Sequence, residues 1–177
     1  MDPDPYCSPL LLFAENVDFH AIAYILLLIL LFMVSALMSG SETALFSLSK
    51  SEIETFRSSR NPSEENVARL LEKPERLLAT ILIVNNFVNI GIVLIFEYLL
   101  RYYLVIEHPV LRVVVSVVLT TFLLVLFGEV LPKVYATGNY KGFSRFASGP
   151  MTVVVSLMRI FSAPFMLLSR GLEKILA

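Results

Sequence analysis

The stretch that organises the chain is V-L-F-G-E-V-L-P-K at residues 125–133, where an apolar run ends in a glycine, a carboxylate and a proline. Proline has no N–H, and its ring clashes with the carbonyl group four residues earlier in a helix. Pro132 therefore leaves the C=O of Gly128 without its helical partner, beside the ionisable side chain of Glu129. Such a carbonyl is tolerated inside a membrane only where it lines a cavity or meets another partner, and a hard cation is the partner that we expect.

The composition places the chain in the membrane class. Of its 177 residues, 56% are hydrophobic and 16% are charged, and the mean hydropathy is +0.76. Soluble domains carry about a quarter of charged residues, so this chain departs strongly from them. Residues 1–19 contain no Lys or Arg, so no basic region precedes the first apolar run and a cleaved signal peptide is not expected.

Uncharged runs predict an all-α membrane protein with three transmembrane helices, because about 20 apolar residues span a bilayer core as a helix. The predicted spans are residues 19–47, 75–104 and 110–137. Between the first two spans, residues 48–74 form a polar segment with five Lys and Arg residues, which we expect to fold as short helices on the cytoplasmic side. The N-terminus is then expected outside the cell and the C-terminus in the cytoplasm.

Two helix starts are marked within this polar segment. Ser51 and Glu54 have the spacing of a capping box. Asn61, Pro62 and Glu64 supply an N-cap, a first-turn proline and an acidic third position. Two short amphipathic helices are therefore predicted.

Residues 140–176 are expected to form an amphipathic juxtamembrane belt helix. Polar residues recur through them at three- or four-residue spacing, with one gap around residues 162–166, which leaves one polar stripe on a largely apolar helix. A fourth span over residues 146–169 is the alternative, because Arg159 is the only charge there. A central arginine costs about 2.5–3.5 kcal/mol on insertion scales, and a fourth span would carry the basic C-terminal end outside. These two arguments favour the belt.

Polar residues inside the predicted spans gather on one face of each helix. They are Ser35, Ser39 and Glu42 in the first span, Asn85, Asn86 and Asn89 in the second, and Gly128 with Glu129 in the third. Packing is one interpretation, since Ser and Asn join helices, Gly lets backbones approach, and Glu129 has Lys133 four residues further on as a partner. Three amides so close together must nevertheless find hydrogen-bond partners in a medium without water.

The convergence of these residues favours a cation site. All of them offer oxygen donors, with no His or Cys among them, and hard cations such as Mg²⁺ and Ca²⁺ select such ligands. One carboxylate among neutral oxygens gives a site of moderate field that can release its ion, as a carrier must. Ionisable residues within a membrane mark transport pathways by default.

Three motifs resemble the DUF21 transmembrane domain of the CorC/CNNM magnesium transporter family. They are M-S-G-S-E-T-A-L-F-S-L-S-K at residues 38–50, V-N-N-F-V-N at 84–89 and F-G-E-V-L-P-K at 127–133. The resemblance implies a homodimer in the bacterial inner membrane that exports Mg²⁺, with Na⁺ as the candidate coupling ion. It also implies the ligands of the ion, which are Ser39, Asn85, Asn89, Gly128 and Glu129, with Ser35 and Asn86 as supporting residues.

The chain departs from the family pattern after the belt. The family usually continues into a cytosolic pair of CBS domains that binds ATP, and often into a further C-terminal domain. Neither is present here, so the chain resembles an excised transmembrane domain and ATP is expected to act only through domains outside it. The acidic lead M-D-P-D-P at residues 1–5 resembles the branch associated with gliding motility, in which the role would be to support a motility or secretion machine.

Two other classes of function compete with a transporter. A non-transporting scaffold or assembly factor would use the same polar residues only to fix helix packing. An intramembrane enzyme is not expected, because the chain has neither H-E-x-x-H nor G-x-S-x-G and its serines lack a neighbouring histidine base. No catalytic residue and no nucleic-acid partner are therefore expected.

Overall fold

The computed structural model describes residues 19–103 and 108–176, with side chains described within 20–103 and 108–158. It is built from helices, and no strand lies in these ranges. The elements are α2 (Phe19–Phe46), α3 (Lys50–Arg57), α4 (Pro62–Leu70), α5 (Pro74–Tyr103), α6 (Pro109–Leu123), the π-helix η1 (Leu124–Val130), α7 (Leu131–Gly138) and α8 (Tyr140–Leu176). The acidic lead at residues 1–5 and the side chain of Arg159 lie outside the described residues.

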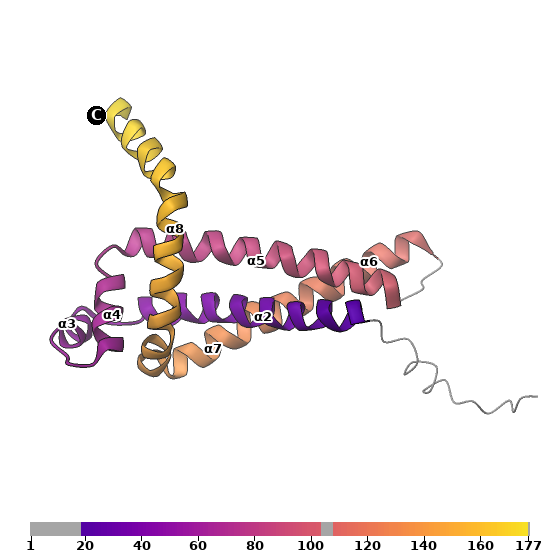
Figure 1. Cartoon of the computed structure of the whole chain (residues 1–177), viewed down its shortest axis with the longest axis horizontal. Helices are drawn as coiled ribbons and strands as arrows, with labels where there is room; N and C mark the ends of the chain where they lie inside the picture. The colour runs from indigo at the N-terminus through magenta and orange to yellow at the C-terminus, as the bar shows by residue number, and fades with distance from the viewer. Residues whose placement is uncertain (1–18, 104–107, 177) are drawn as a thin grey trace, which may run out of the picture.

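Within the described residues, three helical stretches are long and apolar enough to cross a membrane. They are His20–Phe46, Pro74–Tyr103 and Pro109–Gly138, the last of which runs through α6, η1 and α7. Figure 1 shows α2 and α5 side by side, with the third stretch crossing them. Leu26 on α2, Leu94 on α5 and Val118 on α6 are 61%, 66% and 62% exposed, as expected for side chains that face lipid. The predicted fold class, an all-α membrane protein with three spans, is confirmed.

The polar segment between the first two spans forms α3 and α4 at one end of the bundle (Figure 1). The start of α4 follows the sequence signals. The side chain of Asn61 accepts a hydrogen bond from the N–H of Ser63 at 3.0 Å, and Pro62 occupies the first turn. This cap satisfies one of the N–H groups that the first turn of a helix leaves without a partner.

The predicted capping box of α3 is wrong by two residues. The N-cap is Ser49, which accepts from the N–H of Glu52 at 3.3 Å while its own N–H donates to the Glu52 carboxylate at 2.9 Å. The pattern S-x-x-E occurs twice in overlapping positions, starting at Ser49 and at Ser51. Only the first pair coincides with the beginning of the helix at Lys50, so the second pair lies within the helix.

The apolar core lies where α2, α4, α5 and α8 meet. Its fully buried members include Met38, Leu77 and Met151. Figure 1 shows α8 running across the spans near the end where α3 and α4 lie, instead of parallel to them. The close approach of α8 to α2 depends on Gly40, because a Cβ at this position would lie 2.5 Å from the ring of Phe143.

Two ion pairs connect α8 to the short helices. The Nζ atom of Lys141 lies 2.7 Å from Oε1 of Glu52, and Nε of Arg145 lies 2.7 Å from Oε1 of Glu64. The Lys141 ammonium, together with the backbone N–H and the hydroxyl of Ser49, lowers the pKa of Glu52 from 4.5 to about 2. The hydrogen bond to Glu52 in turn raises the pKa of Lys141. Both groups therefore stay charged throughout the neutral pH range.

Candidate functional site

The stretch at residues 125–133 forms an irregular helix, as its proline predicts. Residues Leu124–Val130 adopt a π-helix, and the N–H of Leu131 donates to the C=O of Leu126, five residues earlier. Pro132 follows at once, in the first turn of α7. The wider turn relieves the clash between the proline ring and the carbonyl four residues back, and π segments of this kind are frequent at functional sites.

Ser35 lies where the three spans meet. Its side chain is fully buried in α2, and its Oγ lies 3.1 Å from Oδ1 of Asn85 and 2.9 Å from Oδ1 of Asn89, both on α5. A hydroxyl carries one proton, so with these amide orientations it donates to one of the two oxygens at a time. The other oxygen keeps its lone pairs directed at the same point. The site is therefore rich in acceptors, which suits a hard cation.

Gly128 brings the third span to the same point. It is buried in η1, and a Cβ at this position would lie 2.9 Å from Oγ of Ser35. Side-chain carbons do not approach an oxygen of another residue this closely, so only glycine lets the backbone of η1 pack directly on α2. Ser35, Asn85, Asn89 and Gly128 are called the polar cluster from here on.

One turn further along α2, Ser39 contacts the same π segment. Its side chain is buried, and its Oγ lies 3.5 Å from the main-chain oxygen of Glu129, which is the long limit of a hydrogen bond. The side chain of Glu129 is half-buried. Among the described residues its carboxylate forms neither an ion pair nor a hydrogen bond. The backbone of Glu129, and not its carboxylate, is therefore the group that the structure joins to the predicted serine.

Glu129 is not paired with Lys133, so the packing interpretation of this carboxylate is wrong about its partner. The Nζ atom of Lys133 lies 3.3 Å from Oε2 of Glu42, which connects α7 to α2 instead. Residues four apart share a face in a regular α-helix. Positions 129 and 133 lie on either side of the junction between η1 and α7, where the rotation per residue changes.

A profile of known sequences identifies the family. The profile of the cyclin M (CNNM) transmembrane N-terminal domain matches residues 25–177. The chain belongs to this family. Over 137 residues this cyclin M domain is 36% identical to the UPF0053 protein of Haemophilus influenzae. The aligned region covers 77% of the chain and 31% of that protein. The domain is 35% identical over 104 residues to the UPF0053 inner membrane protein YfjD of Escherichia coli, covering 58% of the chain and 23% of that protein. The chain thus aligns with less than a third of the length of either relative.

Ser35 has a more central position in the cyclin M domain than the sequence indicates. The family resemblance implies only a supporting role for Ser35, yet its side chain contacts Asn85, Asn89 and the backbone at Gly128. Its spacing of four residues from Ser39 shows that the two serines share a helix face. That spacing does not show which of them lies at the depth of the asparagines, because the depth depends on how α2 and α5 pack.

Asn86 is not brought to the polar cluster. Its side chain is exposed on α5, about 100° around the helix from that of Asn85. It forms no hydrogen bond within the part of the chain that the structure describes. The three asparagines therefore do not act as one group, although their spacing in the sequence predicts that they lie close together on one side of the helix.

A second polar contact joins α5 to α6 and was not predicted. The buried hydroxyl of Ser116 donates to the carboxylate of Glu97, whose other oxygen lies 3.9 Å from Nη2 of Arg101. The sequence indicates only that Glu97 lies near interfacial tyrosines. Nothing in a single sequence pairs it with a serine on the next helix, because that contact depends on the angle at which α5 and α6 cross.

The donors at the polar cluster are neutral oxygens. Among the residues that the structure describes, no three side chains of His, Cys, Asp or Glu gather at one point. A cation at the polar cluster would therefore be bound mainly by hydroxyl, amide and carbonyl oxygens. Such a set suits an ion that keeps part of its hydration shell, as Mg²⁺ does.

Proposed function

We propose that this cyclin M domain carries Mg²⁺ across the membrane and binds it at the polar cluster together with the neighbouring Ser39 and Glu129. The observation that supports the proposal is the contact of Ser35 with Asn85, Asn89 and Gly128, which joins groups from three spans. In an octahedral site with ligand distances of about 2.0–2.1 Å, neighbouring oxygens lie about 2.9 Å apart. The oxygens of Ser35, Asn85 and Asn89 already lie 2.9 and 3.1 Å apart, so the oxygen ligands of the proposed site are gathered at one point.

In this proposal each span supplies part of the coordination. The ligands are the side chains of Ser39, Asn85, Asn89 and Glu129 and the main-chain carbonyl of Gly128, with Ser35 as an additional oxygen. Glu129 contributes the only full negative charge, and it is available because Lys133 is engaged elsewhere. The remaining ligands are neutral, so the field is moderate and the ion can leave on the other side of the membrane.

We infer export across a bacterial inner membrane, with Na⁺ as the coupling ion. Two points support this part of the proposal: the resemblance of the three motifs to the CorC/CNNM family, and the printed name of the Escherichia coli relative, an inner membrane protein. The basic residues of α3 and α4 favour a cytoplasmic location for these helices, with the N-terminus outside and the C-terminus inside.

A homodimer is part of the proposal. Asn86 exposes an amide within a span, and every polar group at membrane depth needs a partner. Three helices also cannot enclose an ion pathway and shield it from lipid at the same time. A second copy packed against this face of α5 would supply both the hydrogen-bond partner and the second wall.

Titration calorimetry of the purified protein with Mg²⁺ tests the binding site. We expect the wild type to bind Mg²⁺ and Glu129→Gln to lose most of the heat of binding, because the substitution removes the one charge at the site. Glu97→Gln is the matched control, since it neutralises a half-buried carboxylate on another span. Equal binding by wild type and Glu129→Gln would remove Glu129 from the site.

Flux into or out of proteoliposomes, followed with a Mg²⁺-sensitive dye, tests transport and its coupling. We expect Mg²⁺ movement that accelerates when an opposing Na⁺ gradient is applied and stops in Glu129→Gln. Movement that is unaffected by the Na⁺ gradient would remove the coupling ion from the proposal but leave the carrier. No movement at all, from protein that still binds Mg²⁺, would contradict the carrier.

A scaffold remains the second candidate function, because the hydrogen bonds of Ser35 with the asparagines would serve helix packing equally well. The two candidate functions predict different effects of Asn85→Ala on thermal stability. A scaffold predicts that this variant loses thermal stability to the same extent with and without Mg²⁺. A carrier predicts that Mg²⁺ stabilises the wild type and that the variant loses this gain.

A further inference from the structure

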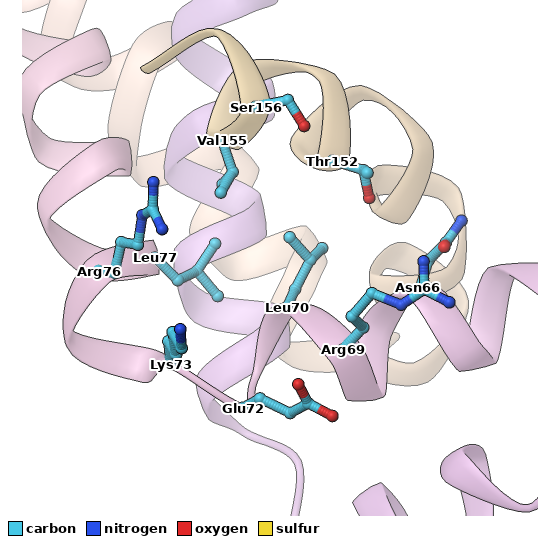
Figure 2. Close-up of a pocket in the computed structure, with 10 residues that line it drawn as sticks. All are labelled: Asn66, Arg69, Leu70, Glu72, Lys73, Arg76, Leu77, Thr152, Val155 and Ser156. Carbon is cyan, nitrogen blue, oxygen red and sulfur yellow. The ribbon is translucent and has the colours of Figure 1, made fainter. Parts of the chain in front are cut away.

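A pocket of about 260 Å³ lies where α4, the start of α5 and the middle of α8 come together (Figure 2). Arg69, Lys73 and Arg76 line it together with one carboxylate. Figure 2 shows Thr152 and Ser156 of α8 across the pocket from these charged side chains. The polar cluster lies elsewhere, and none of these residues belongs to it.

The lining of the pocket has a net positive charge, because it contains three cations and one carboxylate. Its carboxylate, Glu72, lies 3.8 Å from Nη2 of Arg57, which is a cation outside the pocket. Arg69 lies 2.7 Å from Glu65, but both side chains are more than half exposed, and ion pairs of this kind are weak in water. Lys73 is exposed and has no ion pair among the residues described. An excess of positive charge is therefore available to an anion.

Helix α5 places this pocket at the membrane boundary. Residues 77–96 carry no charge, and a helix of about 20 residues rises about 30 Å, the thickness of a bilayer's hydrocarbon core. Arg76 therefore lies at the level of the lipid headgroups, and Lys73 lies almost one turn further out. Because α5 begins at Pro74, the positive end of its helix dipole faces the same region, where the exposed carboxylate of Glu75 in the first turn offsets part of it.

Apolar surface lies directly beside the charges. Leu70, Leu77 and Val155 line the pocket. A free phosphate would use only the cations. A phospholipid would use both the charged and the apolar surface, and basic pockets between membrane helices are known to suit anionic lipid headgroups.

We propose that this pocket binds the headgroup of an anionic phospholipid. The phosphate lies against Arg69, Lys73 and Arg76, and the glycerol oxygens lie near the hydroxyls of Thr152 and Ser156. The acyl chains leave the pocket past its apolar lining residues, Leu70 and Val155, and enter the bilayer. A lipid in this position joins the start of α5 to the crossing helix and so stabilises the packing of α8, independently of Mg²⁺.

Native mass spectrometry of the full chain in mild detergent tests the proposal, with phosphatidylglycerol and phosphatidylcholine titrated separately. The test variant is Arg69→Gln/Lys73→Gln. The matched control is Lys50→Gln/Arg60→Gln, which removes the same total charge from exposed positions of the same polar segment that do not line the pocket. The single variant Lys73→Gln provides a second measurement if the double variant unfolds.

We expect the wild type to retain phosphatidylglycerol in preference to phosphatidylcholine. Each removed charge should lower the apparent affinity for phosphatidylglycerol by about fivefold, so the double variant should lose about 25-fold while the control keeps wild-type binding. Equal loss in test and control variants would show a general charge effect and would overturn the proposal. Inorganic phosphate is added as a competitor, and displacement of the lipid by millimolar phosphate would assign the pocket to a soluble anion instead.

Discussion

Replacing Ser35 by alanine is the sharpest test of the polar cluster. The substitution removes a hydroxyl that lies within hydrogen-bond distance of both Asn85 and Asn89, at 3.1 and 2.9 Å. The two amide oxygens then face each other without a proton between them. An unsatisfied buried acceptor costs about 1–3 kcal/mol, which corresponds to a fall in the melting temperature of about 2–12 °C for a domain of this size.

The matched control is Ser41→Ala. Ser41 is on the same helix and is equally buried, but its hydroxyl donates at 2.5 Å to the C=O of Leu37 within that helix. Such a bond supports no contact between helices, and alanine has the higher helix propensity, so we expect a change of less than about 0.5 kcal/mol.

Thermal unfolding of both variants in detergent, with and without Mg²⁺, gives two readings. Without Mg²⁺, Ser35→Ala should melt well below Ser41→Ala. At a Mg²⁺ concentration 100 times its dissociation constant, the wild type and Ser41→Ala should gain about 2.7 kcal/mol, and Ser35→Ala should gain much less. If the two variants melted together under both conditions, Ser35 would not be the meeting point of the three spans.

Two further predictions concern the backbone at Gly128 and the ion pair between Lys141 of α8 and Glu52 of α3. Gly128→Ala places a Cβ 2.9 Å from Oγ of Ser35, so η1 must move away from α2. We expect thermal unfolding to show a loss of about 1–3 kcal/mol in stability and a loss of the stabilisation by Mg²⁺. Gly138→Ala is the control, and it should show neither effect because the space around Gly138 is open. The pKa of Glu52 is lowered to about 2 by Lys141, so its stabilising effect is complete above its ordinary pKa of 4.5 and is lost as the pH falls from there toward 2. Unfolding temperatures measured from pH 6 to pH 3 should therefore fall less steeply in Glu52→Gln than in the wild type, and parallel curves would contradict this role for the ion pair.

The elements of the fold were open to prediction because each is encoded locally. Residues 77–96 form an uncharged run long enough to span a bilayer. Inside the bilayer no water is available, so the backbone N–H and C=O groups of such a run bond to one another in a helix. The irregular turn at η1 was also predictable, since Pro132 lacks an N–H and disturbs the preceding turn in any context. The start of α3 was less predictable, because two overlapping S-x-x-E pairs compete and only packing of the neighbouring elements selects Ser49.

The candidate site was predictable in its residue types and not in its contacts. Sequence spacing puts Ser35 and Ser39 on one face, but it cannot show that Ser35 is the one that meets Asn85 and Asn89. The sequence also does not give the rotation of α5 about its own axis. Neighbouring residues of a helix point about 100° apart, so packing against α2 covers Asn85 and leaves Asn86 exposed.

The sequence by itself therefore determined that this chain is a three-span membrane domain with oxygen-bearing side chains in its spans, because hydrophobicity and proline chemistry act over a few residues. The tertiary structure decided which of those oxygens lie close together, and it placed Lys133 in an ion pair with Glu42 instead of Glu129. It also formed the basic pocket between α4, α5 and α8. These features depend on crossing angles and helix rotations, which are set by side-chain packing between residues far apart in the chain.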